Sequence, residues 1–462
     1  MSIFRAKKVN MTEGPILSAV IVYSIPIVIG GIIQMLFNSA DLAVVGNFSQ
    51  SKTAAAAAVG ATGPIFNLIV NLFMGMSVGV NIILAHSIGA GDGEKTERIV
   101  HTAVLSSVIL GALVSIIGVS VSRFAMSATN CPEAAYEMAV QYLIIYFLGA
   151  PGILLYNFGA AILRTKGDTK RPLYFLIIAG VLNIILNLIF VIVFKMEAAG
   201  VALATTLTQY LAAFLTLRCL MSQTDETRVD LKRLRICRKE MTEIIIHGLP
   251  NGLANVMYSI ANIQIMSALN AYDISAINGS AASANLETIM ASAVGASNSA
   301  AVAFVGQNIG AKKSDRILRS MFSCMFLSVS FSVICGNLMY IFGAPLIRLF
   351  NSSDELVIKY GLIRAGIMLR TYFLYGFSGT LNATLQAFGH STAVLINSVL
   401  SICGLRTLWM QFWYPQHKTI ETLFWCYPVS MALVTVVDIF MLIIVYRNYI
   451  KQIKKEKNEQ AD

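Results

Sequence analysis

The chain repeats itself at an interval of about half its length. The segment AILRTKGDTKRPLY, around Gly167, matches ATLQAFGHSTAVLI, around Gly389, at an offset of 222 residues. Two more pairs lie at nearly the same offset: SIGAGDG with NIGAKKS, and Pro26 with Pro250. Two similar halves made of apolar helices are typical of secondary transporters, which bind substrate between the halves. The repeat therefore predicts a membrane protein with two related lobes.

The composition requires a bilayer as the solvent. Of the 462 residues, 56% are hydrophobic and 13% are charged, with a mean hydropathy of +0.70. A soluble domain carries about 25% charged residues. The net charge of +10 does not indicate nucleic-acid binding, because cationic residues between membrane spans usually mark cytoplasmic loops.

The apolar residues divide into twelve spans, each near the roughly 20 residues that cross a bilayer as a helix. The expected fold is therefore all-α, with twelve transmembrane helices in two pseudo-symmetric six-helix lobes. The spans cover 15–38, 53–83, 99–122, 138–162, 172–194, 198–217, 244–269, 275–307, 318–342, 356–385, 391–412 and 422–446. The expected domains are an N-lobe over 1–221, a cytoplasmic linker over 222–243, a C-lobe over 244–450 and a basic cytoplasmic tail over 451–462. The charged linker is expected to form an amphipathic helix on the membrane surface.

The loop cations predict the orientation. Of the 34 Lys and Arg residues, 24 fall in one set of loops and 6 in the alternating set. Because cations accumulate in cytoplasmic loops, the first set is expected inside the cell, together with both termini. The expected location is the inner cell membrane, with the chain crossing it many times.

Enzyme and metal motifs are missing from the sequence. The seven cysteines are scattered and form no CxxC pair, and no HExxH, GxxxxGK[ST] or GxSxG occurs. We therefore expect no enzyme activity, cofactor or metal site. Without a nucleotide-binding loop, the energy for transport must come from an ion gradient, or transport is passive.

Asp41 is the principal candidate for a functional residue. It ends the apolar run IPIVIGGIIQMLFNSAD, and Asn38 and Gln34 lie one and two turns before it on nearly the same helix face. Burial favours the neutral form of a carboxyl group, so a carboxyl at this depth can exchange a proton near neutral pH. Pro26, earlier in the same helix, is expected to kink or weaken it.

The second half carries ionisable residues of its own. Glu287, Asp438, Arg370 and Arg406 lie within spans, and Arg364 is expected to extend toward an outer helix end. One interpretation pairs Arg370 and Arg406 with Glu287 and Asp438, and another places some of them at a substrate cavity. The candidate C-lobe cavity residues are Asn262, Glu287, Arg370 and Asn382. A cavity rich in amides, aromatics and methionines but poor in charge suits bulky amphipathic ligands.

Taken together, these motifs resemble the multidrug and toxic compound extrusion (MATE) family along nearly the whole chain. The matching segments are VVGNFSQSKTAAAAAVG after Asp41, ILRTKGDTKRPLY, HGLPNGLANV, FVGQNIGAKKSDR and LQAFGHS. The resemblance is to the proton-coupled, DinF-like branch. It implies two six-helix lobes, an alternating-access cavity and export of small amphipathic compounds by cation antiport. We expect a monomer.

The resemblance also implies roles for individual residues. Asp41 is the proton site, surrounded by the polar residues Tyr142, Asn157, Asn183 and Thr205, and Pro26 is the bend that responds. Sodium-coupled relatives carry acids in helices seven and ten, where this chain has NGLANVMYSIANIQ and TYFLYGFSGTLNATLQ without an acid. Proton coupling is therefore favoured, with sodium coupling as the alternative.

Two other functions compete with multidrug export. A flippase for lipid-linked precursors would need a strongly cationic cavity, for which only Arg370 and Arg406 are available. A membrane-embedded prenyl or glycosyl transferase would need clustered acids such as DDxxD to hold a metal and pyrophosphate, and the sequence has none.

Overall fold

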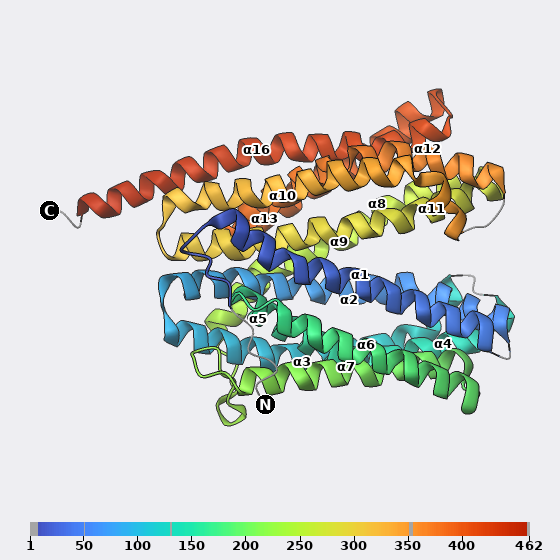
Figure 1. Ribbon diagram of the computed structural model, residues 1–462, viewed down its shortest axis with the longest axis horizontal. Helices are drawn as coiled ribbons and strands as arrows, with labels where there is room; N and C mark the ends of the chain where they lie inside the picture. Colours follow the sequence, from blue (N-terminus) through green and yellow to red (C-terminus); the bar gives the residue numbers. More distant parts are fainter. Residues whose placement is uncertain (1–7, 50, 130–131, 351–353, 460–462) are drawn as a thin grey trace. The chain divides into compact units, whose positions relative to one another are not determined.

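The computed structural model describes residues 8–49, 51–129, 132–350 and 354–459, and within these ranges the chain is helical with no β-strand. Cys131 and the last three residues of the predicted tail lie outside the described residues. One helix or a run of two or more helical segments occupies each of the twelve predicted spans (Figure 1). The all-α membrane fold predicted from the sequence is thus confirmed.

The first half of the chain forms seven α-helices and one π-helical segment. They are α1 Ile16–Phe48, α2 Lys52–Ala90, α3 Gly93–Ala128, α4 Glu133–Leu148, α5 Ala150–Thr165, α6 Lys170–Leu188, the π-helical η1 Ile189–Val193 and α7 Glu197–Met221. Pro26 lies inside α1 but does not interrupt it. The expected weakening is therefore limited to the backbone hydrogen bond that proline cannot donate.

The second half repeats this order with more interruptions. It comprises α8 Arg238–Leu269, α9 Ile274–Gly310, α10 Ser314–Ile341, α11 Gly343–Phe350, α12 Glu355–Thr371, α13 Phe373–Ala387, α14 Ser391–Ser398, η3 Val399–Gly404, α15 Leu405–Leu408, η4 Trp409–Trp413, η5 Tyr414–Gln416 and α16 Ile420–Glu459. Both η3 and η4 are π-helical. A proline, Pro250, again lies inside the first helix, α8.

Nine helices of the described chain are long and apolar enough to cross a membrane, and the pair α4 and α5, bent by 44°, makes a tenth. The two predicted spans outside this count are α8 and the pair α12 and α13. Amides such as Asn255 and Asn262 make α8 more polar, and α12 carries two arginines on a helix of only 17 residues. These polar and charged side chains make the two spans, both in the second half of the chain, less apolar than the other ten.

The chain divides into two compact units. One holds Ile29–Gly252 with the N-terminal arm up to Val9, and the other holds Asn10–Val28 and the residues from Leu253 onward. Helices α1 and α8 are therefore each shared between the units, which a simple cut at the linker does not predict. In each helix the division falls two residues after the internal proline, Pro26 or Pro250.

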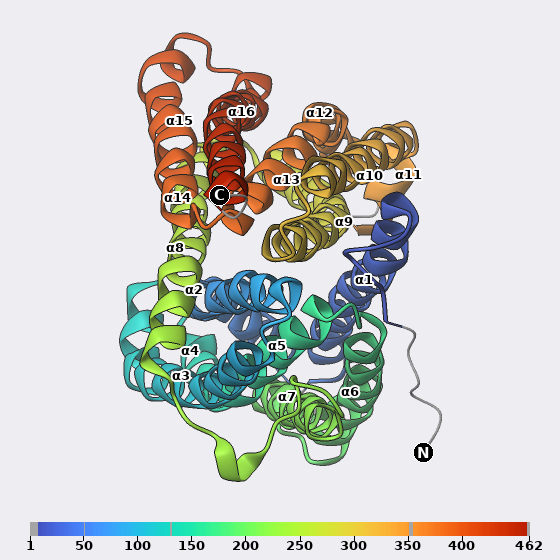
Figure 2. The same cartoon turned by 90° about the vertical axis from the view of Figure 1, so that its left-hand side faces the viewer.

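Small residues set the helix packing inside each unit. In the first unit, Gly75 and Gly79 of α2 face Gly248 and Gly252 of α8, and a Cβ on Gly79 would lie 2.8 Å from the Gly248 nitrogen. In the second unit, a Cβ on Gly279 would lie 2.7 Å from the Gly361 nitrogen. Such close backbone approach is how helices associate in lipid, where apolar side chains gain nothing by leaving the solvent. Figure 2 shows each unit as a bundle seen nearly along its helices.

The internal repeat is visible in the backbone. Gly167 and Gly389 both have φ = 88°, in the left-handed region that favours glycine. Each closes its helix with the same pair of bonds: the glycine N–H donates three residues back, and the next N–H donates five residues back. This is a Schellman motif. A second pair of turns closes with the same pattern of bonds. Its left-handed residue is Gly91 in the first half, with φ = 70°, and Lys312 in the second half, with φ = 54°.

The linker between the halves is not the predicted surface helix. Residues 222–237 contain only the short 3₁₀ turn η2 Leu231–Arg233, and α8 already begins at Arg238. The segment folds back onto the first unit, where the Asp230 N–H donates to His101 Nε2 (3.1 Å) and the Cys237 N–H to Thr102 Oγ1 (3.1 Å). The prediction of an amphipathic helix failed because backbone N–H groups of this segment bond to side chains of α3 instead of to carbonyl groups of a helix of their own.

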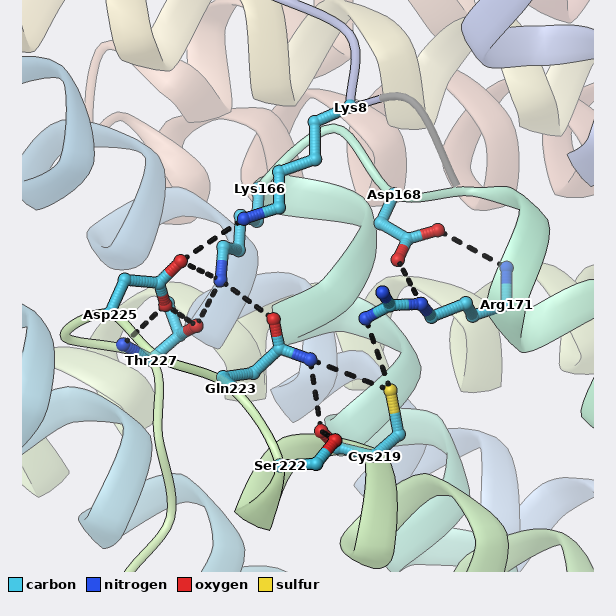
Figure 3. Close-up of polar contacts among 9 residues, drawn as sticks. All are labelled: Lys8, Lys166, Asp168, Arg171, Cys219, Ser222, Gln223, Asp225 and Thr227. Carbon is cyan, nitrogen blue, oxygen red and sulfur yellow. Dashed lines mark hydrogen bonds and ion pairs between the residues drawn. The ribbon is translucent and has the colours of Figure 1, made fainter. Parts of the chain in front are cut away.

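A cluster of charged side chains fixes the start of this linker (Figure 3). Asp225 forms ion pairs with Lys166, in the Gly167 turn, and with Lys8 (3.1 Å). Lys166 Nζ also donates to Gln223 Oε1 (3.0 Å) and Thr227 Oγ1 (2.7 Å). Burial acts to raise the pKa of Asp225, but the hydrogen bonds from Lys166 and Thr227 hold that pKa well below its usual range. Burial lowers the pKa of Lys166 to about 8 despite its bond to Asp225.

Candidate functional site

Asp41 and three other side chains of the first unit form a closed ring of hydrogen bonds. Asn187 Nδ2 donates to Asp41 Oδ1 at 2.5 Å and to Asn183 Oδ1 at 3.2 Å. Asn183 Nδ2 donates to Thr205 Oγ1 at 3.2 Å, and Thr205 Oγ1 returns to Asp41 Oδ2 at 3.5 Å. We call Asp41, Asn183, Asn187 and Thr205 the Asp41 ring.

The sequence explains how three helices meet at the Asp41 ring. Asn183 and Asn187 lie four residues apart on α6, so both amides project from one face. Asp41 comes from α1 and Thr205 from α7. Asn187 is fully buried, while Asn183 and Thr205 are 5% and 8% exposed. All the partners of the carboxyl are thus neutral side chains held inside the unit.

The ring suits a carboxyl group that changes its charge. Both carboxylate oxygens accept bonds here, which is the arrangement for the ionised form. A protonated carboxyl must donate one bond instead. Amide and hydroxyl groups can donate or accept. Rotation of the Asn183 amide and the Thr205 hydroxyl would let a protonated Asp41 donate to Thr205 while it still accepts from Asn187. No fixed cation among the described residues pairs with Asp41, so neither charge state is locked.

A small cavity opens beside the ring. Its volume is about 30 Å³, room for one or two water molecules. Phe37 lines the cavity and packs directly on Gly180, where an added Cβ would collide with the phenyl ring of Phe37. Its lining residues are Gln34, Phe37, Asn38, Asp41, Leu176, Ala179, Gly180, Asn183, Thr205, Thr208, Gln209 and Ala212. The cavity beside the Asp41 carboxyl group is therefore large enough for water, which could carry protons to and from it, but too small for an organic substrate.

The other predicted N-lobe residues lie around the ring or apart from it. Gln34 donates to Asn38 (3.3 Å), and both line the cavity. Tyr142 is buried and stacks on Tyr146, with ring centroids 5.6 Å apart. Asn157 donates to the carbonyl of Ile153 (2.8 Å) in its own helix.

Among the described contacts, neither Tyr142 nor Asn157 bonds to the Asp41 ring. The residue that the sequence prediction missed is Asn187. Its spacing of four residues from Asn183 was the available signal.

The second unit pairs its charges differently from the sequence prediction. Glu287 forms a two-point ion pair with Arg364, at 2.7 Å (Nε–Oε1) and 3.0 Å (Nη2–Oε2). Arg364 Nη1 also donates to Ser280 Oγ at 2.7 Å. Arg364 is only 7% exposed, so the expectation that it extends toward a helix end is wrong.

Arg370 and Arg406 likewise have other partners than those predicted. Arg370 is exposed and lies over the ring of Tyr340, 5.5 Å from its centroid. Fully buried Arg406 donates to Asn262 Oδ1 (2.8 Å) and Ser430 Oγ (3.1 Å). Its guanidinium also stacks over two tyrosine rings, Tyr258 and Tyr427. The predicted pairing of these arginines with Glu287 and Asp438 is therefore wrong.

Of the candidate C-lobe cavity residues, Asn262 and Glu287 bind two arginines whose guanidinium groups lie over the same Tyr427 ring, 4.4 Å and 5.8 Å from its centroid. Asn262 binds Arg406, Glu287 binds Arg364, and Arg370 is exposed. Asn382 on α13 is half-buried, and no described group donates to its Oδ1. Within the described chain, no group of three or more His, Cys, Asp or Glu side chains is placed to hold a metal ion.

Comparisons with known proteins agree with this architecture. The MatE family model matches residues 26–189 and 250–409, one segment in each half. The chain is 28% identical over 401 residues to "Probable multidrug resistance protein YpnP" of Bacillus subtilis, covering 87% of this chain and 89% of that protein. It is 27% identical to the "FAD transporter" of Shewanella oneidensis, covering 75% and 77%.

A solved structure shares the fold. It is described as the "Outward-facing conformation of a multidrug resistance MATE family transporter of the MOP superfamily". It superposes with a TM-score of 0.88 at 21% identity, covering 96% of this chain and 99% of that one. The family model spans well over half of the chain, on both sides of the repeat. The chain therefore belongs to the MatE family of multi-pass membrane transporters and is not an enzyme.

Proposed function

We propose that this protein exports amphipathic organic compounds from the cell by proton antiport, through alternating access between its two lobes. Asp41 carries the coupling proton, and the protein works as a monomer in the cell membrane with both termini in the cytoplasm. The observation that carries the proposal is the Asp41 ring, a carboxyl held only by neutral groups that can reverse their bonds.

The coupling follows from the cost of an uncompensated charge. The ionised carboxyl needs donors from α6 and α7, and the protonated form needs an acceptor. The two forms therefore favour different arrangements of α1 against these helices. A ligand that binds one arrangement better must change proton affinity, and the proton must change ligand affinity by the same factor.

The relatives support the substrate class. YpnP is named a probable multidrug resistance protein, and the flavin dinucleotide of the Shewanella relative is a large anionic aromatic compound. Arg406, buried with no acid bonded to it among the described residues, supports a second candidate class, the anionic amphipathic compounds. A lipid-linked precursor is less well supported because, of the two arginines available for a strongly cationic cavity, only Arg406 is buried, while Arg370 is exposed.

Transport into inside-out vesicles tests the proposal. Vesicles with an imposed proton gradient should accumulate aromatic cations, neutral amphipathic compounds or flavin-like anions, and a sodium gradient of equal size should drive none of them. Vesicles from cells without the protein give the background. Uptake driven by sodium alone would overturn the proton assignment, and no uptake of any class would overturn the export function.

A further inference from the structure

The second unit contains a carboxyl group that the proposed function does not use. Asp438 on α16 is 0% exposed. Its Oδ1 accepts one bond, from Asn397 Nδ2 at 2.7 Å, and no described donor reaches its Oδ2. Ser401 Oγ completes the group by donating to Asn397 Oδ1 at 2.8 Å.

This group repeats the construction of the Asp41 ring. In both units, the helix that follows a left-handed glycine turn carries two polar residues four positions apart, hydrogen-bonded to each other. In both, an amide of that pair donates to a carboxyl on another helix. The helix then widens into a π-helical segment, η1 after Asn187 and η3 around Ser401. Such segments are rare and occur frequently at functional sites.

The depth of the two groups differs. Asn183 lies sixteen residues after Gly167, whereas Asn397 lies eight residues after Gly389. With a rise of 1.5 Å per residue, the second group lies about 12 Å nearer its glycine turn. The two carboxyl groups therefore do not occupy equivalent positions of the repeat. The same arrangement of a carboxyl and a hydrogen-bonded polar pair occurs at two different distances from the glycine turn.

Among the described residues, no cation pairs with Asp438. Arg364 is bound to Glu287, and Arg406 reaches α16 at Ser430, two helical turns before Asp438. The helices and turns that pack against α16 carry the titratable groups Tyr258, Glu355, Lys359, Tyr360, Arg364, Arg370, Tyr375, Cys403 and Arg406, and neighbouring turns of α16 carry Cys426, Tyr427, Tyr446 and Arg447. None of these groups has a described hydrogen bond or ion pair with Asp438. Helix α14 carries no titratable group.

An ionised carboxylate here would be costly. Transferring a charge into an apolar interior is far more expensive than one neutral hydrogen bond can offset, so the group takes up a proton instead. We propose that Asp438, positioned by Asn397 and Ser401, is a second proton-binding site and holds its proton in this conformation. The inference depends only on the surroundings of Asp438 and does not require Asp41 to be the coupling site.

Infrared spectroscopy of the purified protein tests this directly. A protonated carboxyl gives a C=O stretching band that is separate from the band of an ionised carboxylate. At neutral pH, Asp438→Asn should remove one protonated-carboxyl band. The matched control is Glu421→Gln, which removes an exposed acid at the start of the same helix and should leave those bands unchanged.

A second variant guards against misfolding of Asp438→Asn. Asn397→Ala keeps the carboxyl but removes the bond to its C=O, so the same band should move to higher frequency rather than vanish. Loss of an ionised-carboxylate band in Asp438→Asn would overturn the inference, as would an unchanged band in Asn397→Ala. Failure of proton-driven uptake with this band intact would overturn only the proposed function.

Discussion

At the scale of single residues, the chemistry rests on which carboxyl groups have a fixed cation partner and which do not. Glu287 has one in Arg364, while Asp41 and Asp438 have only neutral partners among the described residues. An arginine partner favours the charged form of a carboxylate, so we expect the two acids with neutral partners to be the ones that exchange protons.

The first prediction concerns Asp41→Asn. The amide keeps the shape of the side chain and can still bond Asn187 and Thr205, but it cannot titrate. Proton-driven efflux should fall to background while substrate still binds. In the wild type, a change of one pKa unit on binding corresponds to about a tenfold change in affinity. Binding measured across pH should show that dependence in the wild type and not in the variant.

Melting of the variant must be measured alongside, because a structural role for Asp41 predicts a poorly folded protein instead. Glu421→Gln serves again as the control with an exposed acid removed. A well-folded Asp41→Asn protein that pumps at the wild-type rate would remove Asp41 from the mechanism.

The second prediction concerns the buried ion pair. Glu287→Gln leaves the Arg364 guanidinium buried without its counter-ion, which should cost about 3–5 kcal/mol of unfolding free energy. Replacing both partners by methionine should recover most of that loss. Arg370→Gln should change stability by less than about 0.5 kcal/mol, because Arg370 is exposed. Melting in detergent measures all three variants, and equal melting of Glu287→Gln and Arg370→Gln would contradict the pairing.

Residue-level prediction from the sequence succeeded where one helix face decided the outcome. Gln34 and Asn38 were placed on the face of Asp41 from helix spacing, and all three line one cavity. The grouping of Asn183 and Thr205 with Asp41 came instead from the family resemblance, and these three side chains are hydrogen-bonded together. The pairing in the second unit was predicted wrongly. Which of three arginines reaches Glu287 depends on helix rotation and on the length of a flexible side chain, and spacing along the chain fixes neither.

At the scale of elements, the helix ends follow local rules that the sequence displays. Gly167 and Gly389 have the same φ and the same pair of closing bonds. The linker is the contrasting case. Its charges suggested an amphipathic helix, but the contacts of Asp225, Asp230 and Cys237 with distant residues hold it in an irregular path. Such long-range partners are invisible to a local pattern.

The third prediction compares two left-handed positions. Gly167→Ala should destabilise the protein by about 1–3 kcal/mol, because the new Cβ meets the backbone of Val9 and the φ of 88° is strained for alanine. Lys312→Gly should instead be about 1 kcal/mol more stable than Lys312→Ala. Both Lys312 variants lose the exposed ion pair to Glu456, so their difference in melting isolates the backbone strain.

The fourth prediction concerns pH and the linker cluster. The pKa of Asp225 is lower in the folded protein than in the unfolded chain, so its contribution to stability is complete at neutral pH. That contribution is lost as the pH falls below about 5, when the unfolded chain binds the proton first. Asp225→Asn should lower stability by about 1–3 kcal/mol at pH 7, and the gap to the wild type should close on acidification.

Glu226→Gln is the matched control for this cluster, since Glu226 is the exposed neighbour of Asp225. Its melting should follow the wild type at every pH. A gap between wild type and Asp225→Asn that stays constant from pH 7 to pH 2 would contradict the assignment of the ion pair to Lys166.

At the scale of the whole molecule, the repeat predicted the architecture. The offset of 222 residues identified two related halves, and the loop cations gave the proposed orientation. The unit boundaries inside α1 and α8 were not predicted, although Pro26 and Pro250, two residues before each boundary, were the available signal.

The fifth prediction concerns that orientation. Leu231 in the linker is 50% exposed, and a cysteine placed there in a cysteine-free background should react with a membrane-impermeant reagent only after the cells are opened. Lys418→Cys, in a loop of the alternating set, should react in intact cells. Labelling at 231 from outside would reverse the assigned topology.

The two shared helices have a mechanical consequence. Each continuous rod, α1 or α8, lacks one backbone hydrogen bond at its proline, two residues before the point where it passes to the other unit. A helix that lacks one backbone hydrogen bond bends most easily at that point. If the two lobes move as proposed above, we expect α1 and α8 to bend first near Pro26 and Pro250, and replacing either proline with alanine should stiffen that helix.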